Sequence, residues 1–289
     1  MPEILQFLFS GLTVGAIYAL VALGFTLIYN ASDVINFAQG EFVMLGGMVT
    51  FFAHAAGVPL PLAALLAIIV ATAVGLLLHQ FAIEPARGAS AVTLIIITIG
   101  ASIFLRGVAA IVFKNFHSLP PLAGGEPWIV GGAALLPQSI IVLIGAGAIV
   151  AGLWAFMTMT LTGKALVATA ANRLAARLVG INTSALVGLA FAVSAAIGAI
   201  GGILMTPITL TSYDVGTLLA LKGFAAAMLG GMGNPLGAVI GGLIVGLLEA
   251  FSAGYLSSSY KDAVAFLVIL GVLFVMPHGL LGRAAVERV

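Results

Sequence analysis

The chain has 289 residues, of which 62% are hydrophobic and only 7% are charged, and its formal net charge is +1. A charge this small gives no long-range field that would attract nucleic acid. The absence of cysteine excludes disulfides, thiolate catalysis and cysteine metal sites. The composition is typical of a polytopic helical membrane protein, because about 20 consecutive apolar residues span a bilayer.

Nine helices are predicted along the chain, with short connections between them. Eight nearly uncharged tracts predict eight of them: residues 4–28, 39–57, 60–82, 91–113, 139–161, 184–205, 236–248 and 263–276. Residues 217–233 are shorter and contain Lys222, so we expect a short or broken helix that still crosses. The alternative there is a half-helix that enters the membrane and returns. The expected fold class is an all-α polytopic membrane protein with about eight to nine transmembrane helices, built as a single domain over residues 1–289.

Two polar segments interrupt the apolar tracts. Residues 116–138 contain Pro120, Pro121, Pro127 and Pro137 and are too polar to span a membrane, so we expect an external loop. Residues 162–183 form the longest polar stretch on the predicted cytoplasmic side.

Basic residues predict the orientation. With the N-terminus outside and nine crossings, six basic residues face the cytoplasm, namely Arg87, Lys164, Arg173, Arg177, Arg283 and Arg288. Only Lys114 and Lys261 face outward, as the positive-inside rule requires, and the C-terminus is then cytoplasmic. The first five residues carry no Lys or Arg, which favours a retained helix over a signal peptide.

Glycine is abundant, with 37 residues, and much of it lies inside the apolar tracts. Four pairs have GxxxG spacing: Gly11/Gly15, Gly198/Gly202, Gly237/Gly241 and Gly242/Gly246. Small residues at this spacing let helix backbones approach closely in lipid. The sequence therefore predicts a tightly packed bundle.

A polar stretch, residues 30–41, separates the first two tracts and contains Asn36, Gln39 and Glu41. In one interpretation Ser32 or Asp33 caps the next helix and Glu41 lies near its positive end. In the other, the stretch is a polar gate at the cytoplasmic mouth of a pathway.

A basic cytoplasmic helix is predicted between Lys164 and Gly180, with Gly180 as its C-cap. Arg173 and Arg177 are four residues apart and share one face. The opposite face is small and apolar, and it comprises Ala168, Ala171, Ala175 and Leu178. Such a helix suits docking into a groove of a partner, or equally an interfacial position against lipid headgroups.

Three charges, Arg106, Lys222 and Glu249, fall within the tracts, where charges usually face protein or water. Lys222 and Glu249 are candidates for an ion pair, Glu249 alternatively lies near the outer boundary, and Arg106 is placed to snorkel. The roles left open are a structural anchor, or a substrate or proton site. The glycine-rich residues 230–237 predict either a helix break beside a pathway or a tight cytoplasmic turn.

Motifs for catalysis are absent from the sequence. It contains no G-x-x-x-x-G-K-[ST] or H-E-x-x-H pattern and no paired carboxylates, and its four histidines are scattered. We therefore expect no catalytic residue, no metal site, no cofactor and no enzymatic activity.

Several segments resemble the branched-chain amino acid ABC permeases, and in particular their shorter, LivH-type subunit. They are residues 11–29 (GLTVGAIYALVALGFTLIY), 35–41 (INFAQGE), 44–46 (MLG) and 222–238 (KGFAAAMLGGMGNPLGA) with Glu249 beyond, and residues 171–182 resemble the cytoplasmic coupling segment.

The resemblance implies an importer subunit in the bacterial inner membrane. Its implied partners are a second homologous permease, two ATP-binding cassette subunits, a periplasmic substrate-binding protein and membrane lipid, without nucleic acid. It places ATPase coupling at residues 162–183, and specifically at Lys164, Asn172, Arg173, Arg177, Gly180 and Asn182. The substrate-pathway candidates are Tyr18, Asn36, Gln39, Glu41, Gly231, Gly233, Asn234 and Pro235.

Alternatives remain open at the level of the sequence. Related permeases transport branched-chain or other amino acids, or urea and short amides. An ion-coupled secondary transporter would need a carboxyl group that titrates during its cycle, and Glu41 or Glu249 could serve. A purely structural membrane subunit is the third class.

Overall fold

Eleven α-helices and one short hairpin make up the chain in this computed structural model, which describes residues 2–112 and 115–282. In chain order the elements are α1 (Pro2–Ser32), α2 (Gln39–Ala55), α3 (Leu60–Leu78) with the π-helical turn η1 (His79–Ile83), α4 (Ala91–Val112), β1 (Trp128–Val130), β2 (Ala133–Leu135), α5 (Pro137–Met159), α6 (Leu161–Ala171), α7 (Arg173–Leu178), α8 (Thr183–Met205), α9 (Val215–Gly230), α10 (Pro235–Tyr255) and α11 (Lys261–Val275). The strands pair antiparallel, with Ile129 opposite Ala134.

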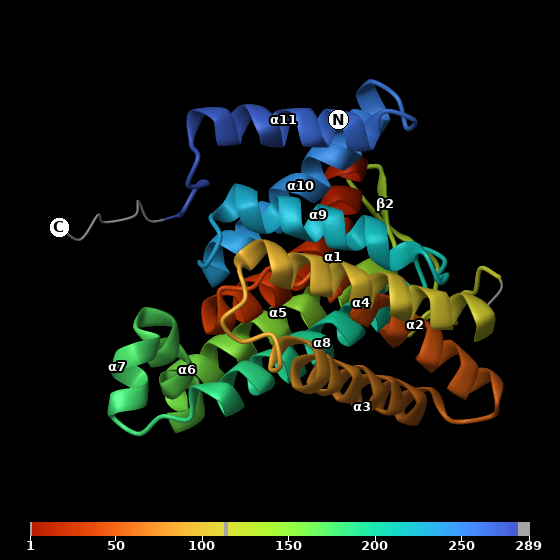
Figure 1. Cartoon of the computed structure of the whole chain (residues 1–289). Helices are drawn as coiled ribbons and strands as arrows, with labels where there is room; N and C mark the ends of the chain where they lie inside the picture. Colours follow the sequence, from red (N-terminus) through yellow and green to blue (C-terminus); the bar gives the residue numbers. More distant parts are fainter. Residues whose placement is uncertain (1, 113–114, 283–289) are drawn as a thin grey trace.

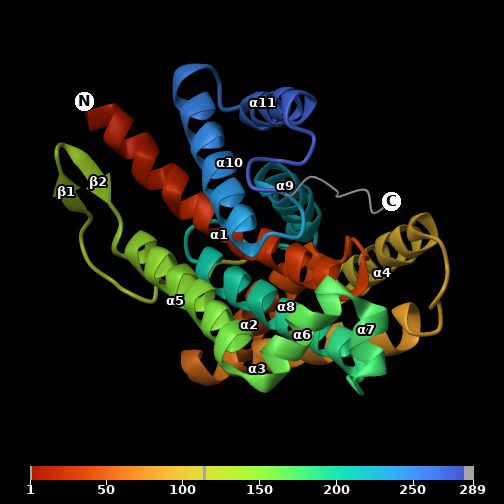
Figure 2. The same ribbon diagram turned by 90° about the vertical axis from the view of Figure 1, so that its left-hand side faces the viewer.

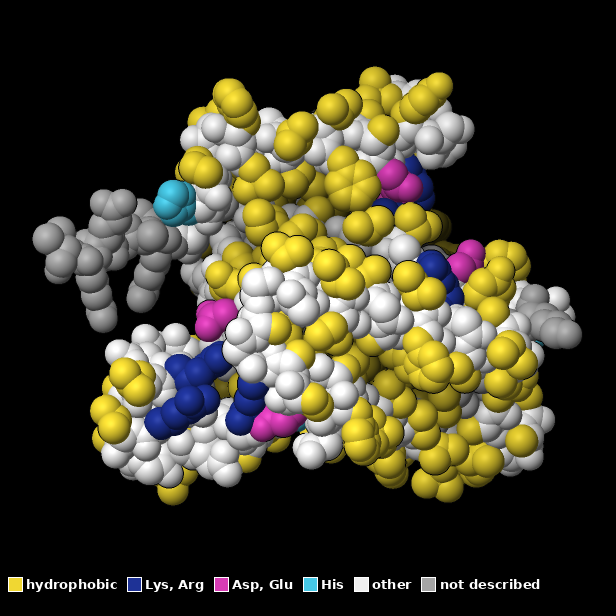
Figure 3. All heavy atoms as spheres, in the orientation of Figure 1, with side chains coloured by type: hydrophobic (Ala, Val, Ile, Leu, Met, Phe, Trp, Pro, Cys, Tyr) yellow, Lys and Arg dark blue, Asp and Glu magenta, His cyan; other side chains and the backbone are white. Residues whose placement is uncertain are grey.

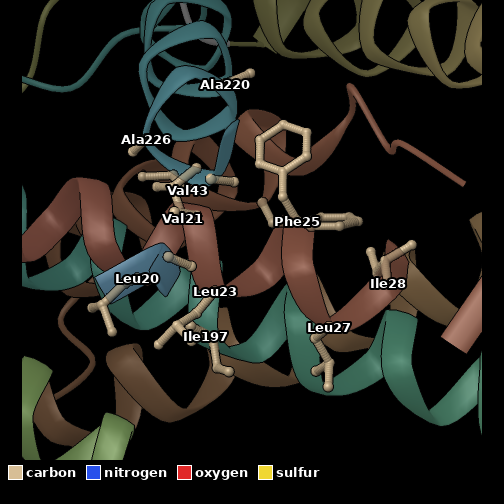
Figure 4. Close-up of a cluster of buried hydrophobic side chains, with 14 of the residues drawn as sticks. Leu20, Val21, Leu23, Phe25, Leu27, Ile28, Val43, Ile197, Ala220 and Ala226 are labelled. Atoms are coloured by element: carbon tan, nitrogen blue, oxygen red, sulfur yellow. The ribbon is translucent and has the colours of Figure 1, made fainter. Parts of the chain in front are cut away.

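The central element is α1, which packs against α5, α8, α9 and α10 and runs through the middle of the bundle in both views (Figures 1 and 2). Its most apolar stretch is 89% buried. Figure 4 shows Leu20, Leu23, Phe25 and Ile28 of α1 among side chains from neighbouring helices. A helix that is apolar on every side is buried on every side, and α1 follows that rule.

The outer helices expose their apolar side chains. In α3, α4 and α5 only 22%, 11% and 17% of the most apolar stretch is buried. Large exposed side chains include Phe104 and Ile111 of α4 and Trp154 of α5. Apolar surface of this extent marks contact with lipid or another protein.

The two ends of the bundle are distinct. In Figure 1, α6 and α7 lie at the left end and the β1–β2 hairpin lies at the right. At the left end Arg173 donates to the carbonyl oxygen of Ala31, and Asn30 donates to that of Gly233. At the right end Gln6 of α1 accepts a hydrogen bond from the backbone N–H of Ala134. The N-terminal turn of α1 therefore lies opposite α6 and α7.

Six helices are long and apolar enough to cross a membrane within the described residues: α1, α3 with η1, α4, α5, α8 and α10. The all-α polytopic membrane fold is thereby confirmed. Three further helices, α2, α9 and α11, have 17, 16 and 15 residues. Of the two forms expected for residues 217–233, the structure shows the short one: α9 is a continuous helix that ends at Gly230.

All four predicted GxxxG pairs lie where helices touch. A Cβ atom on Gly15 would be 2.9 Å from the Cα atom of Leu243, and one on Gly246 would overlap the backbone of Gly15, so α1 and α10 are in backbone contact. Gly202 of α8 abuts the backbone of α2 in the same way, and Gly241 of α10 abuts α9. The prediction of close helix approach is confirmed.

Candidate functional site

The first buried polar cluster joins α1, α2 and α8. Gln39 begins α2 and is fully buried, and its side-chain oxygen accepts a hydrogen bond of 2.6 Å from the hydroxyl of Ser194. The Gln39 amide nitrogen donates to the carbonyl oxygen of Ser194 at 3.2 Å. Gly24 of α1 leaves the space for this amide, because a Cβ atom there would collide with it. The cluster fixes where α2 starts.

The second cluster surrounds Glu41, two residues further along α2. Its Oε1 accepts a hydrogen bond of 2.8 Å from Ser102 of α4, while its Oε2 is buried without a hydrogen-bond partner. Arg106, on the next turn of α4, donates to Thr217 of α9 at 2.7 Å. Arg106 therefore bridges two helices within the protein, whereas the sequence suggested snorkelling.

In the polar stretch before α2, neither of the two residues predicted to cap that helix does so. No side chain caps α2; Ser32 bonds back to the carbonyl oxygen of Ile28 within α1, and Asp33 is exposed with a positive φ of 57°. Instead the side-chain oxygen of Asn36 accepts from the N–H of Ala38 at 3.1 Å. The expectation that Ser32 or Asp33 caps the helix is wrong, because the chain leaves α1 only after Ser32.

The third cluster is a charge network. Lys222 of α9 contacts both carboxylate oxygens of Glu249 at 2.9 Å and a carboxylate oxygen of Asp262 at 2.8 Å. Lys261 contacts Glu249 at 3.1 Å. The Tyr18 hydroxyl donates to Glu249 at 2.6 Å and accepts from Lys222 at 3.0 Å. The pair that the sequence left open is thus formed, and Tyr18 belongs to it.

A tight turn joins α9 to α10, and it contains the pathway candidates Gly231, Gly233, Asn234 and Pro235. Both glycines have positive φ values, 105° and 91°, and Pro235 is the first residue of α10. Asn234 caps α10 by accepting from the N–H groups of Leu236 and Gly237. Of the two interpretations, the structure shows the turn at the end of the bundle rather than a break inside a helix.

The predicted coupling segment is two helices rather than one. Asn172 interrupts it and caps α7 by accepting from the N–H of Ala175 at 2.9 Å, so Ala168 and Ala171 lie on a different helix from Ala175 and Leu178. The expectation of one helix with a continuous apolar face in this segment is therefore wrong. Gly180, with φ of 87°, ends α7 as predicted, and Asn182 caps α8.

Both arginines of α7 contact their own chain. Arg173 donates to Ala31 at the end of α1, and its guanidinium is 3.6 Å from Asp33. Arg177 donates to Thr183 at the start of α8, at 2.8 Å. They line one cavity together with Arg87, and Figure 3 shows Lys and Arg side chains gathered at this end of the molecule. Lys164 is exposed on α6.

A family model described as "Branched-chain amino acid transport system / permease component" matches residues 7–273. The chain belongs to this family.

Individual relatives match over nearly their whole length. The chain is 38% identical to the "High-affinity branched-chain amino acid transport system permease protein LivH" of Salmonella typhimurium, over 99% of this chain and 97% of that protein. The Escherichia coli LivH is 37% identical over the same shares. The corresponding protein BraD of Pseudomonas aeruginosa is 35% identical, and the match covers 100% of both chains.

Sequence reasoning missed several partners in this permease fold. Ser194, Ser102 and Thr217 are single hydroxyl residues inside apolar or mixed tracts and carry no pattern of their own. Lys261 and Asp262 stand together just before the last tract, and this adjacent pair of opposite charges was the one available signal.

Proposed function

We propose that this chain is the membrane-embedded permease subunit of a binding-protein-dependent ABC importer for branched-chain amino acids. The observation that carries the proposal is the near-complete match, at 35–38% identity, to permeases named for high-affinity branched-chain amino acid transport. The alternative substrates urea and short amides have no such support among these relatives.

The proposed topology has nine crossings in one membrane domain of the bacterial inner membrane. It adds α2, α9 and α11 to the six long helices; at 1.5 Å per residue these three reach about 22–26 Å, slightly less than a bilayer core of about 30 Å. The end with Arg87, Arg173 and Arg177 faces the cytoplasm under the positive-inside rule, so the N-terminus faces outward. Lys114, Arg283 and Arg288, which also entered the prediction, lie outside the described residues.

Two observations support the proposed partners: the sequence has no ATP-binding motif, and apolar side chains are exposed at one end of the bundle. A phosphate-binding G-x-x-x-x-G-K-[ST] motif is absent, so ATP hydrolysis belongs to separate cassette subunits. At the end proposed to be cytoplasmic, Leu174 and Leu178 of α7 and Val179 directly after it are exposed at 70%, 80% and 77%. Because the α7 arginines are bonded to their own chain, we assign the cassette contact to this apolar face and the arginines to anchoring α7. A periplasmic binding protein and a second permease complete the proposed importer.

The buried polar clusters are proposed to lie beside the substrate pathway. Tyr18 belongs to the central helix α1, and Gln39 and Glu41 are buried at the start of α2. Intramembrane polar groups usually face a pathway or a bundle interior. Gly231, Gly233, Asn234 and Pro235 are assigned to the turn that links α9 to α10.

The test is uptake of radiolabelled leucine into liposomes that contain this chain with its cassette, second permease and binding protein. We expect uptake that requires ATP inside the liposomes and binding protein outside. Proton-driven uptake by this chain alone, abolished by Glu41→Gln or Glu249→Gln, would instead establish an ion-coupled secondary transporter. Uptake of urea but not leucine by the full assembly would reassign the substrate.

A further inference from the structure

A small cavity lies between α1, α9 and α10, next to the first turn of α11. Its volume is about 200 Å³, which is room for roughly seven water molecules at about 30 Å³ each. Pockets for drug-sized ligands start near about 300 Å³, so this space suits one small molecule. Its polar lining consists of Tyr18, Lys222, Glu249 and Lys261, together with the hydroxyl residues Thr13 and Thr209.

The rest of the cavity wall is apolar. Its lining includes Val14 and Ile17 of α1, Ile208 of the segment after α8, and Val215 and Leu218 of α9. The cavity therefore has one charged side and one aliphatic side. Burying an aliphatic side chain against such a wall is favourable by about 25 cal/mol per Å².

Charges of opposite sign alternate along the polar side. The order is Lys261, Glu249, Lys222 and Asp262, with successive distances of 3.1, 2.9 and 2.8 Å. The two inner residues are nearly buried, with side chains 11% and 8% exposed, whereas Asp262 and Lys261 are 42% and 41% exposed. In Figure 3 acidic and basic side chains meet beneath α11, at the molecular surface. Each inner charge thus has a second partner nearer to solvent.

Stability alone does not account for this arrangement. A buried ion pair is often no more stable than well-packed apolar residues in its place, although removing one partner alone is strongly destabilising. Three charged side chains, Lys222, Glu249 and Lys261, line the cavity. In a chain with only 7% charged residues, this concentration indicates a function for the cavity.

We infer that this cavity binds the zwitterionic backbone of one small, neutral, aliphatic amino acid within the permease itself. Lys222, with Lys261, receives the carboxylate, while Glu249 receives the ammonium group. Asp262 stays paired with Lys222 outside the cavity lining. The aliphatic side chain then lies against Val14, Ile17 and Val215. The inference rests on the proposed function, and it adds a substrate-binding site in the permease to the one in the binding protein.

Charge balance explains why the ligand is neutral. The network contains two cations and two anions, so a zwitterion can enter it without leaving a charge unpaired. An acidic or basic amino acid would bring a third charge against the aliphatic wall, where an unpaired charge is strongly unfavourable. An amine or a carboxylic acid without the other group would leave one side of the network unmatched.

The test measures ligand binding to the assembled transporter in lipid nanodiscs, without binding protein or nucleotide, by saturation-transfer NMR with valine. Isobutylamine lacks the carboxylate of valine, isovalerate lacks its ammonium group, and glutamate adds a charge. We expect each of these to bind at least tenfold more weakly than valine. Equal binding of valine and either truncated ligand, or no valine binding to the wild-type assembly, would overturn the inference.

Two variants locate the site. Glu249→Gln removes one charge, and Val215→Phe fills the cavity without touching the network; both should weaken valine binding at least tenfold, while Glu126→Gln on the exposed loop should not. Should Glu249→Gln fail to assemble, Val215→Phe and the truncated ligands still decide. Unchanged valine binding in the assembled variants would contradict the inference. ATP-dependent leucine uptake, measured in the same preparation, tests the proposed function separately, so the two failures can be told apart.

Discussion

Ser194 shows how a single hydroxyl organises the centre of the fold. It lies in the middle of α8 and is fully buried, and its single hydroxyl hydrogen is shared between the side-chain oxygen of Gln39 and the carbonyl oxygen of Gly24. Three helices therefore meet at one oxygen atom. Hydrogen bonds between membrane helices average only about 0.6 kcal/mol and reach about 1.7 kcal/mol. Leaving a buried acceptor unpaired is worse, at about 1–3 kcal/mol.

Ser194→Ala should therefore lower the stability of the protein by about 1–2 kcal/mol, because the side-chain oxygen of Gln39 loses its donor. The measurement is the midpoint of thermal unfolding of the purified protein in detergent. Ser258→Ala, at an exposed position in the turn before α11, is the control and should leave the midpoint unchanged. Equal midpoints for both variants would show that Gln39 finds another donor at no cost.

At the level of elements, helices were predictable and their polar contacts were not. The tract 60–82 became a helix over Leu60–Ile83, and 184–205 became Thr183–Met205, because apolar length alone dictates a membrane helix. The contacts of Ser194 and Thr217 depend on which helices become neighbours, and no local pattern encodes that. Asn172 is intermediate: its preference for N-caps was a usable signal for the break between α6 and α7.

The α1–α10 contact depends on glycine. Gly246→Leu should destabilise the bundle by at least about 1–3 kcal/mol, the usual effect of overpacking, because its side chain would have to enter the backbone of Gly15. Reduced yield of folded protein and a lower unfolding midpoint are the expected readouts. Gly152→Leu in α5 is the matched control, since a Cβ atom there meets nothing within 4 Å. A Gly246→Leu protein as stable as the control would contradict the close approach.

At the scale of the whole molecule, α7 connects the end of the bundle that we propose to be cytoplasmic to the core. Arg173 ties it to the end of α1, the most buried helix, and Arg177 ties it to the start of α8. A partner that moves α7 would therefore displace α1 and α8, which meet α2 at the cluster of Gly24, Ser194 and Gln39. The α7 surface that remains free for a partner is apolar, which favours burial against a groove.

Leu174→Asp with Leu178→Asp should abolish ATP-dependent uptake and release the cassette subunits, while the membrane domain stays folded because both side chains are exposed at 70% and 80%. Co-purification of the cassette subunits with the permease, together with leucine uptake in liposomes, measures both effects. The control is Leu256→Asp, a leucine exposed at 69% beyond the other end of α10, which should retain the cassette subunits. The assignment would be reversed by the opposite pair of results. In that case the leucine double variant keeps the cassette subunits and still transports leucine, whereas Arg173→Glu with Arg177→Glu loses them, and the contact belongs to the basic side chains.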